Sequence, residues 1–367
     1  MVEGDYKIPS DLQYADIRRW RRLMGMKQIL VMMAAVVVVG CSNDTPETSQ
    51  AAEAEAQVAS MPTPEPTPEP TPEPDPVSPA DEKLITDPIV EKAVRYSLEA
   101  DGLLAVTLPV VELTKTDLQK VTGLILINNE ITDEGLKELA KLPNLNALDL
   151  HGPKITGKGF LELAKLPNLN ALDLRGPKIT DKSLREVARL QNLKFLDLTD
   201  TKITDAGLKE LVKLQKLERL NLPGTKITDT GLKEVVKLQK LEWLNLRETQ
   251  ISDAGLKEVA KLQELEFLQL GSPQITDAGL KEVAKLQKLE SLRLGSPQVT
   301  DAGLKEVVKL QKLEGLWLGG TQVTDAGLKE VAKLQKLEYL NLYGSQITKA
   351  AVVEFKKSLP NCNIKGP

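Results

Sequence analysis

Histidine and cysteine, two residue types much used in nucleophilic and metal-dependent chemistry, are rare in this 367-residue chain. It has one histidine, His151, and two cysteines, Cys41 and Cys362. A single histidine is too few for a histidine-based metal site or a catalytic triad, and two cysteines in unrelated contexts are too few for a disulfide framework. The sequence also lacks a glycine-rich phosphate loop. We therefore expect no enzyme activity, no catalytic residue, no metal and no cofactor.

One row of carboxylates could nevertheless do chemistry. Asp149, Asp173 and Asp197 recur at a spacing of 24 residues, and on adjacent strands they would lie about 5 Å apart. Such a row could bind a cation or supply a general acid and base. Nothing nearby in the sequence supplies a nucleophile or the rest of a coordination shell. We expect these carboxylates to pair with Arg175 or His151 instead.

Large side chains gather at positions where short strands would point them away from the core. Trp, Tyr and Arg are the usual anchors of binding interfaces. The expected binding residues on this face are Phe195, Arg219, Trp243, Phe267, Arg293, Trp317, Tyr339 and Tyr343. Exposed aromatic residues on a sheet can also stack on one another across strands, and the two interpretations are compatible. In contrast to these variable positions, the segment GLKEVAKLQKLE recurs almost unchanged.

A strict repeat of 24 residues must position these side chains. The nine units start at Ile131, Ile155, Ile179, Ile203, Ile227, Ile251, Ile275, Val299 and Val323. Leu208, Leu211 and Val212 are spaced i, i+3, i+4, which predicts the apolar stripe of a short helix, and Leu220 and Leu222 alternate as on a strand. Stacked strands lie about 4.8 Å apart and packed helices about 8–10 Å apart, so the strand side of the stack must be concave.

The period and the L-x-x-L-x-L pattern resemble leucine-rich repeats, and ITDxGL resembles the ribonuclease-inhibitor-like and F-box-associated type. The resemblance covers residues 84–367. It implies an α/β horseshoe solenoid with a parallel sheet of about ten strands on the concave side and short helices on the convex side. We expect an N-terminal cap with a degenerate first repeat at 83–130, nine repeats at 131–346 and a C-terminal cap at 347–367.

Both caps have sequence signals of their own. Asp87 and Pro88 predict the start of a helix that ends at Gly102. At the other end, residues 349–358 predict a last helix. Cys362 then occupies a place where earlier repeats carry leucine, so we expect it to be a buried small apolar residue.

The N-terminus predicts export. The apolar run 29–39 is too short to span a bilayer, which takes about 20 residues, but it fits the core of a signal peptide. The run continues into VVGC, ending at Cys41, and resembles a bacterial lipobox. That resemblance implies a signal peptide at 1–40, with cleavage before Cys41 and acylation of its thiol. The alternative is an ordinary signal peptide with an incidental cysteine. The true start could be Met24 or Met26.

The composition of residues 41–82 predicts an acidic linker, which a lipid on Cys41 would anchor to a membrane. They hold ten acidic and no basic side chains, and proline occupies every second position from Pro62 to Pro76. Such a segment favours extended polyproline II, which would lift the folded part off a lipid surface. The alternative is a proline-rich ligand for a recognition domain.

Together these features predict a non-enzymatic binding protein in the cell envelope. It would cross the inner membrane, remain lipid-anchored at the outer membrane, touch the membrane through that anchor only, and recognise a protein or polysaccharide on its concave face. We expect no nucleic-acid partner, because the sequence has no dense Lys/Arg patch with interleaved aromatics. The alternatives are a substrate-recruiting subunit, as the F-box-associated resemblance implies, and a structural envelope protein.

Overall fold

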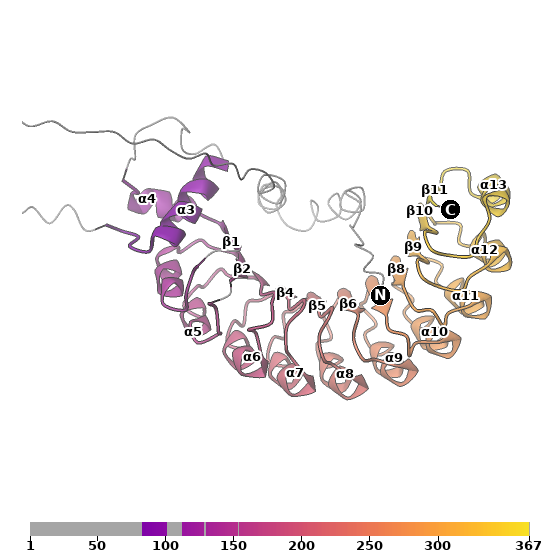
Figure 1. The fold of residues 1–367 in the computed structure, drawn as a ribbon, viewed down its shortest axis with the longest axis horizontal. Coiled ribbons are helices and arrows are strands. Elements are labelled where there is room, and N and C mark those ends of the chain that lie inside the picture. Colours follow the sequence, from indigo (N-terminus) through magenta and orange to yellow (C-terminus); the bar gives the residue numbers. More distant parts are fainter. Residues whose placement is uncertain (1–82, 101–111, 128–129, 153, 367) are drawn as a thin grey trace, which may run out of the picture.

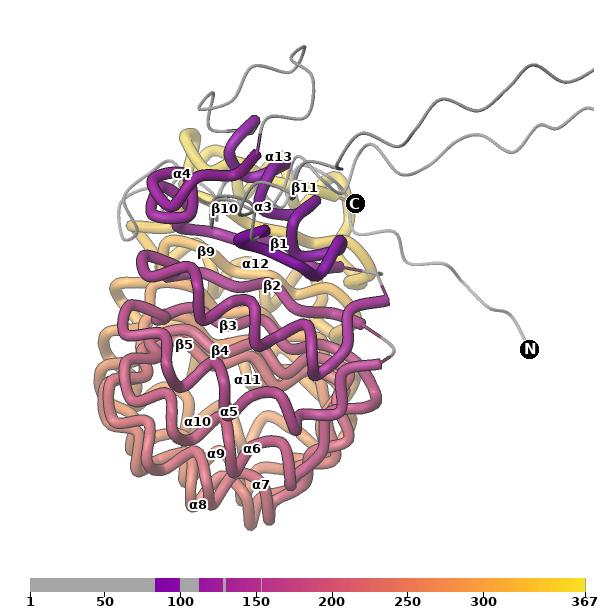
Figure 2. The backbone as a smooth tube through the Cα atoms, turned by 90° about the vertical axis from the view of Figure 1, so that its left-hand side faces the viewer, coloured from indigo at the N-terminus to yellow at the C-terminus, as the bar shows by residue number. Residues whose placement is uncertain are grey.

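The computed structural model describes residues 83–100, 112–127, 130–152 and 154–366. These residues form a curved solenoid, with parallel strands on the inner side of the arc and helices on the outer side (Figure 1). Successive repeats stack as turns of a coil (Figure 2). The architecture expected from the sequence is confirmed. The expected signal peptide at 1–40, the linker at 41–82 and the helix end at Gly102 lie outside the described residues.

One sheet of eleven strands runs through the described part of the chain in sequence order. The strands are β1 (Gly123–Ile127), β2 (Ala147–His151), β3 (Ala171–Asp173), β4 (Phe195–Asp197), β5 (Arg219–Asn221), β6 (Trp243–Arg247), β7 (Phe267–Gly271), β8 (Ser291–Leu294), β9 (Gly315–Trp317), β10 (Tyr339–Asn341) and β11 (Asn363–Lys365). Every neighbouring pair is parallel, and equivalent residues of successive repeats lie opposite each other, as Leu220 and Leu244 do. The 24-residue period therefore becomes columns of side chains that cross the strands.

The convex side carries short helices. They are α5 (Phe160–Leu163), α6 (Asp181–Val187), α7 (Asp205–Leu211), α8 (Asp229–Val235), α9 (Asp253–Val259), α10 (Asp277–Val283), α11 (Asp301–Val307) and α12 (Asp325–Val331), preceded by the 3₁₀ helix η1 (Gly135–Lys141). Leucines from strands and helices fill the space between these layers, and Leu208, Leu211 and Leu220 are almost completely buried. Val212 is half-buried and forms the C-cap of α7, so the apolar stripe is narrower than expected.

From α7 onward, a threonine or serine and an aspartate join each helix to the one before it. In α7 the Thr204 side chain accepts a hydrogen bond from the backbone N–H of Ala206 and so caps the helix. The same threonine donates both its hydroxyl and its backbone N–H to the carboxylate of Asp181 in the preceding repeat, each at 2.8 Å. This two-bond contact recurs at every junction up to Asp325 and Thr348. We call the series the convex ladder.

From α7 to α12 a glycine early in the helix leaves room for the convex ladder, whereas α13 has Ala351 at the equivalent position. Glycine is a poor helix former, and at Gly207 nothing in the helix itself requires it. A Cβ added there would lie 2.4 Å from Oδ1 of Asp181, inside the contact distance of any real atom pair. The glycine therefore lets the carboxylate of the preceding repeat approach the helix closely enough to hold the next threonine.

Capping elements close both ends of the core. At the N-terminal end lie α3 (Pro88–Ala100) and α4 (Lys115–Lys120), and at the C-terminal end lies α13 (Lys349–Ser358). Asp87 caps α3 by accepting hydrogen bonds from the backbone N–H groups of Ile89 and Val90. Cys362 is buried, and burial raises the pKa of its thiol to about 11. Helices α3, α4 and α13 lie in the segments where the sequence predicts the two caps, and Cys362 is buried as expected.

Candidate binding surface

The first outward column of the sheet brings most of the expected binding residues into one row. Phe195, Arg219, Trp243, Phe267 and Tyr339 each occupy the first position of a strand, β4 to β7 and β10. Parallel pairing in register places Arg219 beside Trp243 and Trp243 beside Phe267. Because adjacent strands lie about 4.8 Å apart, large side chains in such a row are close enough to stack on their neighbours.

These side chains do stack. The rings of Trp243 and Phe267 lie 3.3 Å apart between centroids and are nearly parallel, at 3°. The Arg219 guanidinium carbon lies 5.7 Å from the Trp243 ring centroid on one side of this pair. On the other side, the Arg293 guanidinium carbon lies 5.2 Å from the Phe267 centroid. Each contact has cation–π or stacked geometry.

The row continues through Arg293 and Trp317. These belong to the second outward column, which holds the third residue of each strand. The Arg293 guanidinium carbon also lies 4.5 Å from the Trp317 ring centroid, and the Trp317 ring lies 4.9 Å from that of Tyr339, tilted by 31°. Trp317 reaches the first column because Gly315 leaves space there: a Cβ on Gly315 would lie 2.7 Å from the indole ring. We call the six side chains the concave stack. Its members are Arg219, Trp243, Phe267, Arg293, Trp317 and Tyr339.

Exposure shows what the concave stack presents to a partner. Phe267 is only 2% exposed, whereas Trp243, Arg293 and Trp317 are half-buried. Neighbouring rings and guanidinium groups stack on faces of Trp243 and Trp317, so those faces are not free for a partner. The stacking of aromatic residues on one another across strands, one of the two interpretations of the sequence, is confirmed. Sequence reasoning missed Gly315, although a glycine in a column of large residues was the available signal.

Two other expected binding residues lie on the same face. Phe195 is half-buried and pairs in register with Arg219. Tyr343, which follows β10, is 57% exposed.

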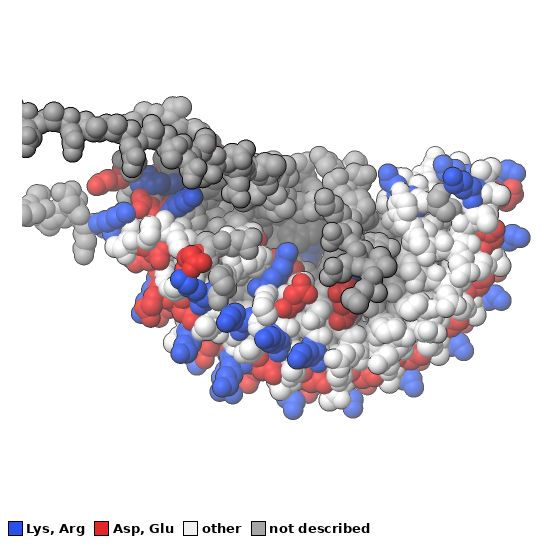
Figure 3. All heavy atoms as spheres, viewed as in Figure 1, with Lys and Arg blue, Asp and Glu red and all other residues white. Residues whose placement is uncertain are grey.

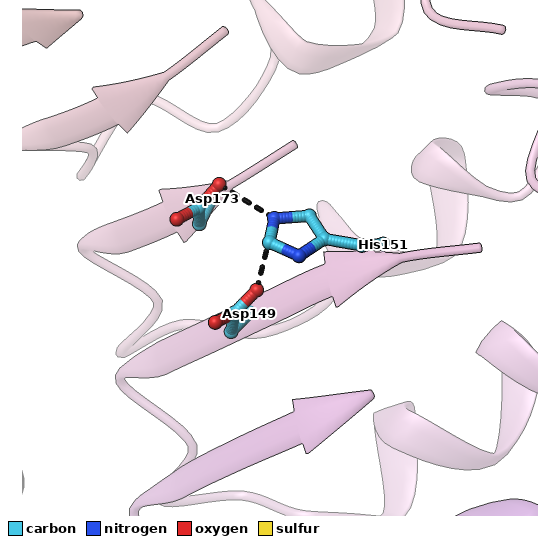
Figure 4. Close-up of side chains that lie close together, drawn as sticks. All are labelled: Asp149, His151 and Asp173. Carbon is cyan, nitrogen blue, oxygen red and sulfur yellow. Dashed lines mark hydrogen bonds and ion pairs between the residues drawn. The ribbon is translucent and has the colours of Figure 1, made fainter. Parts of the chain in front are cut away.

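A second group of functional side chains lies near the N-terminal end of the sheet. Asp149, Asp173 and Asp197 occupy equivalent positions on β2, β3 and β4, and all three are buried. Nε2 of His151 lies 2.8 Å from Oδ1 of Asp173 and 3.1 Å from Oδ1 of Asp149 (Figure 4). Arg175 donates to both oxygens of Asp173, from Nη2 at 2.6 Å and from Nε at 3.1 Å. The expected pairing of the carboxylates with Arg175 and His151 is confirmed. We call these five residues the acidic cluster.

Burial dominates the electrostatics of the acidic cluster. Burial, and after it the charge of Asp173, raise the pKa of the Asp149 carboxyl from 3.8 to about 6. The pKa of Asp197 is also raised, by burial and then by Asp173. Burial lowers the pKa of Arg175, but Asp173 and Asp197 outweigh it and the net pKa is raised. Three carboxylates thus compete for one guanidinium and one imidazole.

Charge on the outer side is mixed. Lysine and arginine alternate with aspartate and glutamate along the convex rim (Figure 3). Many of these side chains form ion pairs within one helix end, such as Lys213 with Glu210 and Lys261 with Glu258. Exposed pairs of this kind contribute little to stability. Within the described part of the chain, no helix is long and apolar enough to cross a membrane.

The fold and the columns of its sheet define a leucine-rich-repeat solenoid. The family model "Leucine-rich repeat region" matches residues 154–347, more than half of the chain, and a second model, "Leucine Rich repeat", matches residues 118–140. The chain belongs to the leucine-rich-repeat family. No curated protein matches it in sequence.

Solved structures share the fold at low sequence identity. An internalin (inlF) from Listeria monocytogenes is 20% identical, with 77% of this chain and 95% of that chain covered and a TM-score of 0.49. Internalin C2 from the same organism is 25% identical, with 71% and 93% covered and a TM-score of 0.44. TLR13, solved in a complex with ssRNA13, is 22% identical, with 69% of this chain covered and a TM-score of 0.51. This chain spans 36% of the TLR13 chain, and the similarity shows the fold alone.

Proposed function

We propose that this chain is a non-enzymatic binding protein whose concave face recognises another protein. The observation that carries this proposal is the concave stack, which aligns two tryptophans, a tyrosine and two arginines across six strands. Tryptophan, tyrosine and arginine dominate the binding energy of protein interfaces. A stack fixed by mutual contacts loses little conformational entropy when a partner binds, which favours affinity.

The geometry of the stack favours a protein segment over a polysaccharide. Sugar C–H groups are attracted to the electron-rich face of an aromatic ring, and the ring edge carries the opposite partial charge. In the concave stack, Phe267 and Arg293 cover ring faces that a sugar would need. Ring edges and guanidinium groups instead match apolar side chains, carbonyl groups and carboxylates of a polypeptide.

The test compares two matched pairs of substitutions. The full chain is immobilised, a partner is captured from a native cell-surface extract and identified, and its Kd is then measured for each variant. Trp243→Ala with Trp317→Ala should weaken binding by at least about 2 kcal/mol, or roughly 30-fold. Lys257→Ala with Lys305→Ala, on the convex helices, should leave the Kd unchanged. Loss of binding with the lysine pair alone would place the partner on the helices and refute the proposal.

Two controls keep the result interpretable. Removing Trp243 also removes its stacking on Phe267, worth about 0.5–1.5 kcal/mol, so urea unfolding must show that the variant is still folded under assay conditions. Treating the extract with protease or with glycoside hydrolases before capture distinguishes the two partner classes. A partner that survives protease and disappears with glycoside hydrolases would overturn the choice of a protein ligand.

We also propose that the chain is lipid-anchored through Cys41 at the outer membrane, after export by the signal peptide 1–40, and that residues 41–82 act as its spacer. The lipobox pattern and the acidic proline-rich composition support this. Cys41→Ser should move the protein from the membrane pellet to the soluble fraction and leave the thermal stability of the repeats unchanged. A variant that stays in the membrane fraction would refute the anchor.

The repeat type is part of the proposal as well. We propose that the repeats are ribonuclease-inhibitor-like, which the helices α6 to α12 on the convex side support.

A further inference from the structure

Three donor groups from two neighbouring strands converge on one point of the concave face. Asp149 and His151 lie on β2, and Asp173 lies opposite Asp149 on β3. Nε2 of His151 and one carboxylate oxygen from each aspartate all lie within 4.8 Å of one another. The two carboxylates point toward the imidazole from the same side of the sheet (Figure 4). The register of the parallel strands holds this arrangement.

The hydrogen bonds of this group leave one oxygen unsatisfied. Nε2 of His151 carries either one hydrogen or one lone pair, yet it faces two carboxylate oxygens. Its shorter contact, 2.8 Å, is the hydrogen bond to Asp173. Oδ1 of Asp149 accepts no hydrogen bond. It is buried, in a residue that is only 7% exposed. A buried carboxylate oxygen without a donor is strongly unfavourable, so something further is expected to bind it.

The charges around this point lead to the same expectation. Arg175 binds both oxygens of Asp173 and lies 3.9 Å from Asp197 on its other side. Its guanidinium therefore pairs with Asp173 and Asp197. Asp149 instead has the imidazole of His151 beside it, with Nε2 at 3.1 Å from Oδ1. One further positive charge beside Asp149 and Asp173 would stabilise the site.

We propose that Asp149, His151 and Asp173 bind a divalent transition-metal ion of the Zn²⁺ class. One imidazole nitrogen and two carboxylate oxygens suit Zn²⁺, Mn²⁺ or Co²⁺, whereas Ca²⁺ and Mg²⁺ prefer oxygen ligands throughout. Ligands at about 2.1 Å from a metal lie roughly 3.0–3.4 Å from one another, and the measured donor separations of 2.8 and 3.1 Å approach this range.

The surrounding residues complete the site. Three protein ligands leave a coordination position for water or for a group of a partner. The bidentate hydrogen bonds from Arg175 fix the orientation of the Asp173 carboxylate, as outer partners of metal ligands commonly do. The structure also supplies what the sequence did not reveal: the imidazole lies between two carboxylates and provides a third donor. This site lies on β2 and β3 and does not depend on the proposed protein partner.

The test exploits the fact that His151 is the only histidine of the chain. The full chain is prepared without a histidine tag and with Cys41→Ser, which removes a competing thiol. Zn²⁺ alone is titrated by calorimetry, and the ¹H–¹⁵N signals of the single imidazole are followed by NMR. One equivalent of Zn²⁺ should bind, shift these signals and raise the unfolding temperature. Co²⁺ should give a saturable visible absorption band.

Matched variants separate a metal site from general attraction to acidic groups. His151→Ala and the isosteric Asp149→Asn should each weaken Zn²⁺ binding about tenfold or more. Asp197→Asn removes the same charge from the next strand and should weaken it less than about threefold. Absence of Zn²⁺ binding, imidazole signals that do not respond to Zn²⁺, or equal losses in all three variants would overturn the proposal. The cluster would then be an imidazole paired with two carboxylates only.

Discussion

Replacing Gly255 by alanine should destabilise the solenoid, although alanine is the better helix former. In an exposed helix this change would stabilise by about 1 kcal/mol. Here a Cβ would lie 2.3 Å from Oδ1 of Asp229 and 2.8 Å from Cδ1 of Leu232. The leucine methyl group is the end of a flexible side chain and can move. The carboxylate cannot move without losing its bonds to Ser252.

The magnitude follows from those bonds. Asp229 accepts from the backbone N–H of Ser252 at 2.8 Å and from its hydroxyl at 2.6 Å. Hydrogen bonds to a charged group contribute about 1.5–3 kcal/mol each, and partial exposure favours the low end of this range. Losing both costs about 3 kcal/mol, and the helix propensity of alanine offsets about 1 kcal/mol. We expect Gly255→Ala to lower the free energy of unfolding by about 2 kcal/mol.

A double-mutant cycle isolates the clash. Urea unfolding followed by circular dichroism is measured for Gly255→Ala, Asp229→Ala and the double variant. Without the carboxylate only the helix propensity of alanine remains, so Gly255→Ala should then stabilise by about 1 kcal/mol, which gives a coupling energy of about 3 kcal/mol. Gly295→Ala is the control, because a Cβ there would meet no atom closer than 3.7 Å. Stabilisation by Gly255→Ala in the otherwise unchanged chain would refute the role assigned to these glycines.

Three further predictions follow from burial. Leu220→Ala should lower the free energy of unfolding by about 2–5 kcal/mol. Glu210→Ala, on the convex side, should change it by about 0.5 kcal/mol or less. Equal losses of stability in the two variants would mean that the repeat is oriented the other way. Because the folded-state pKa of Asp149 is raised from 3.8 to about 6, its contribution to stability is fully present below about pH 4 and is lost as the pH rises toward 6. In metal-free buffer, Asp149→Asn should remove this decline, and an unchanged pH profile would contradict it. Since burial raises the pKa of Cys362 to about 11, its thiol should react with a soluble disulfide reagent only after unfolding, in a Cys41→Ser background; rapid labelling of the folded protein would contradict this.

The sequence predicts the repeat fold well because local spacing decides it. The apolar residues at i and i+3 place the helices, and alternation places the strands. The last helix, expected at 349–358, is observed as α13 with the same bounds. The close approach of Gly207 to Asp181 was not predicted, because it depends on how tightly one repeat docks on the next.

The concave sites were predicted only in part, because side-chain direction depends on residues 24 positions away. The columns identified which residues face outward. They did not show that Trp317 would cross into the first column, which requires the empty space above Gly315 in its own strand. They also did not show that the His151 ring lies between two carboxylates, because the sequence does not specify its rotamer.

The contrast between constant helices and variable strands now separates into two causes. The convex ladder accounts for the recurrence of a hydroxyl residue, an aspartate and a glycine at the starts of α7 to α12, since the first two bond across successive repeats and the glycine leaves room for the carboxylate. It does not explain the recurring exposed pairs such as Glu258 and Lys261, which contribute little to stability. The outward strand positions satisfy the same backbone register with very different side chains, so the fold does not dictate their identity. Selection by a partner on the concave face would account for that variation, and the tryptophan and lysine pairs test it directly.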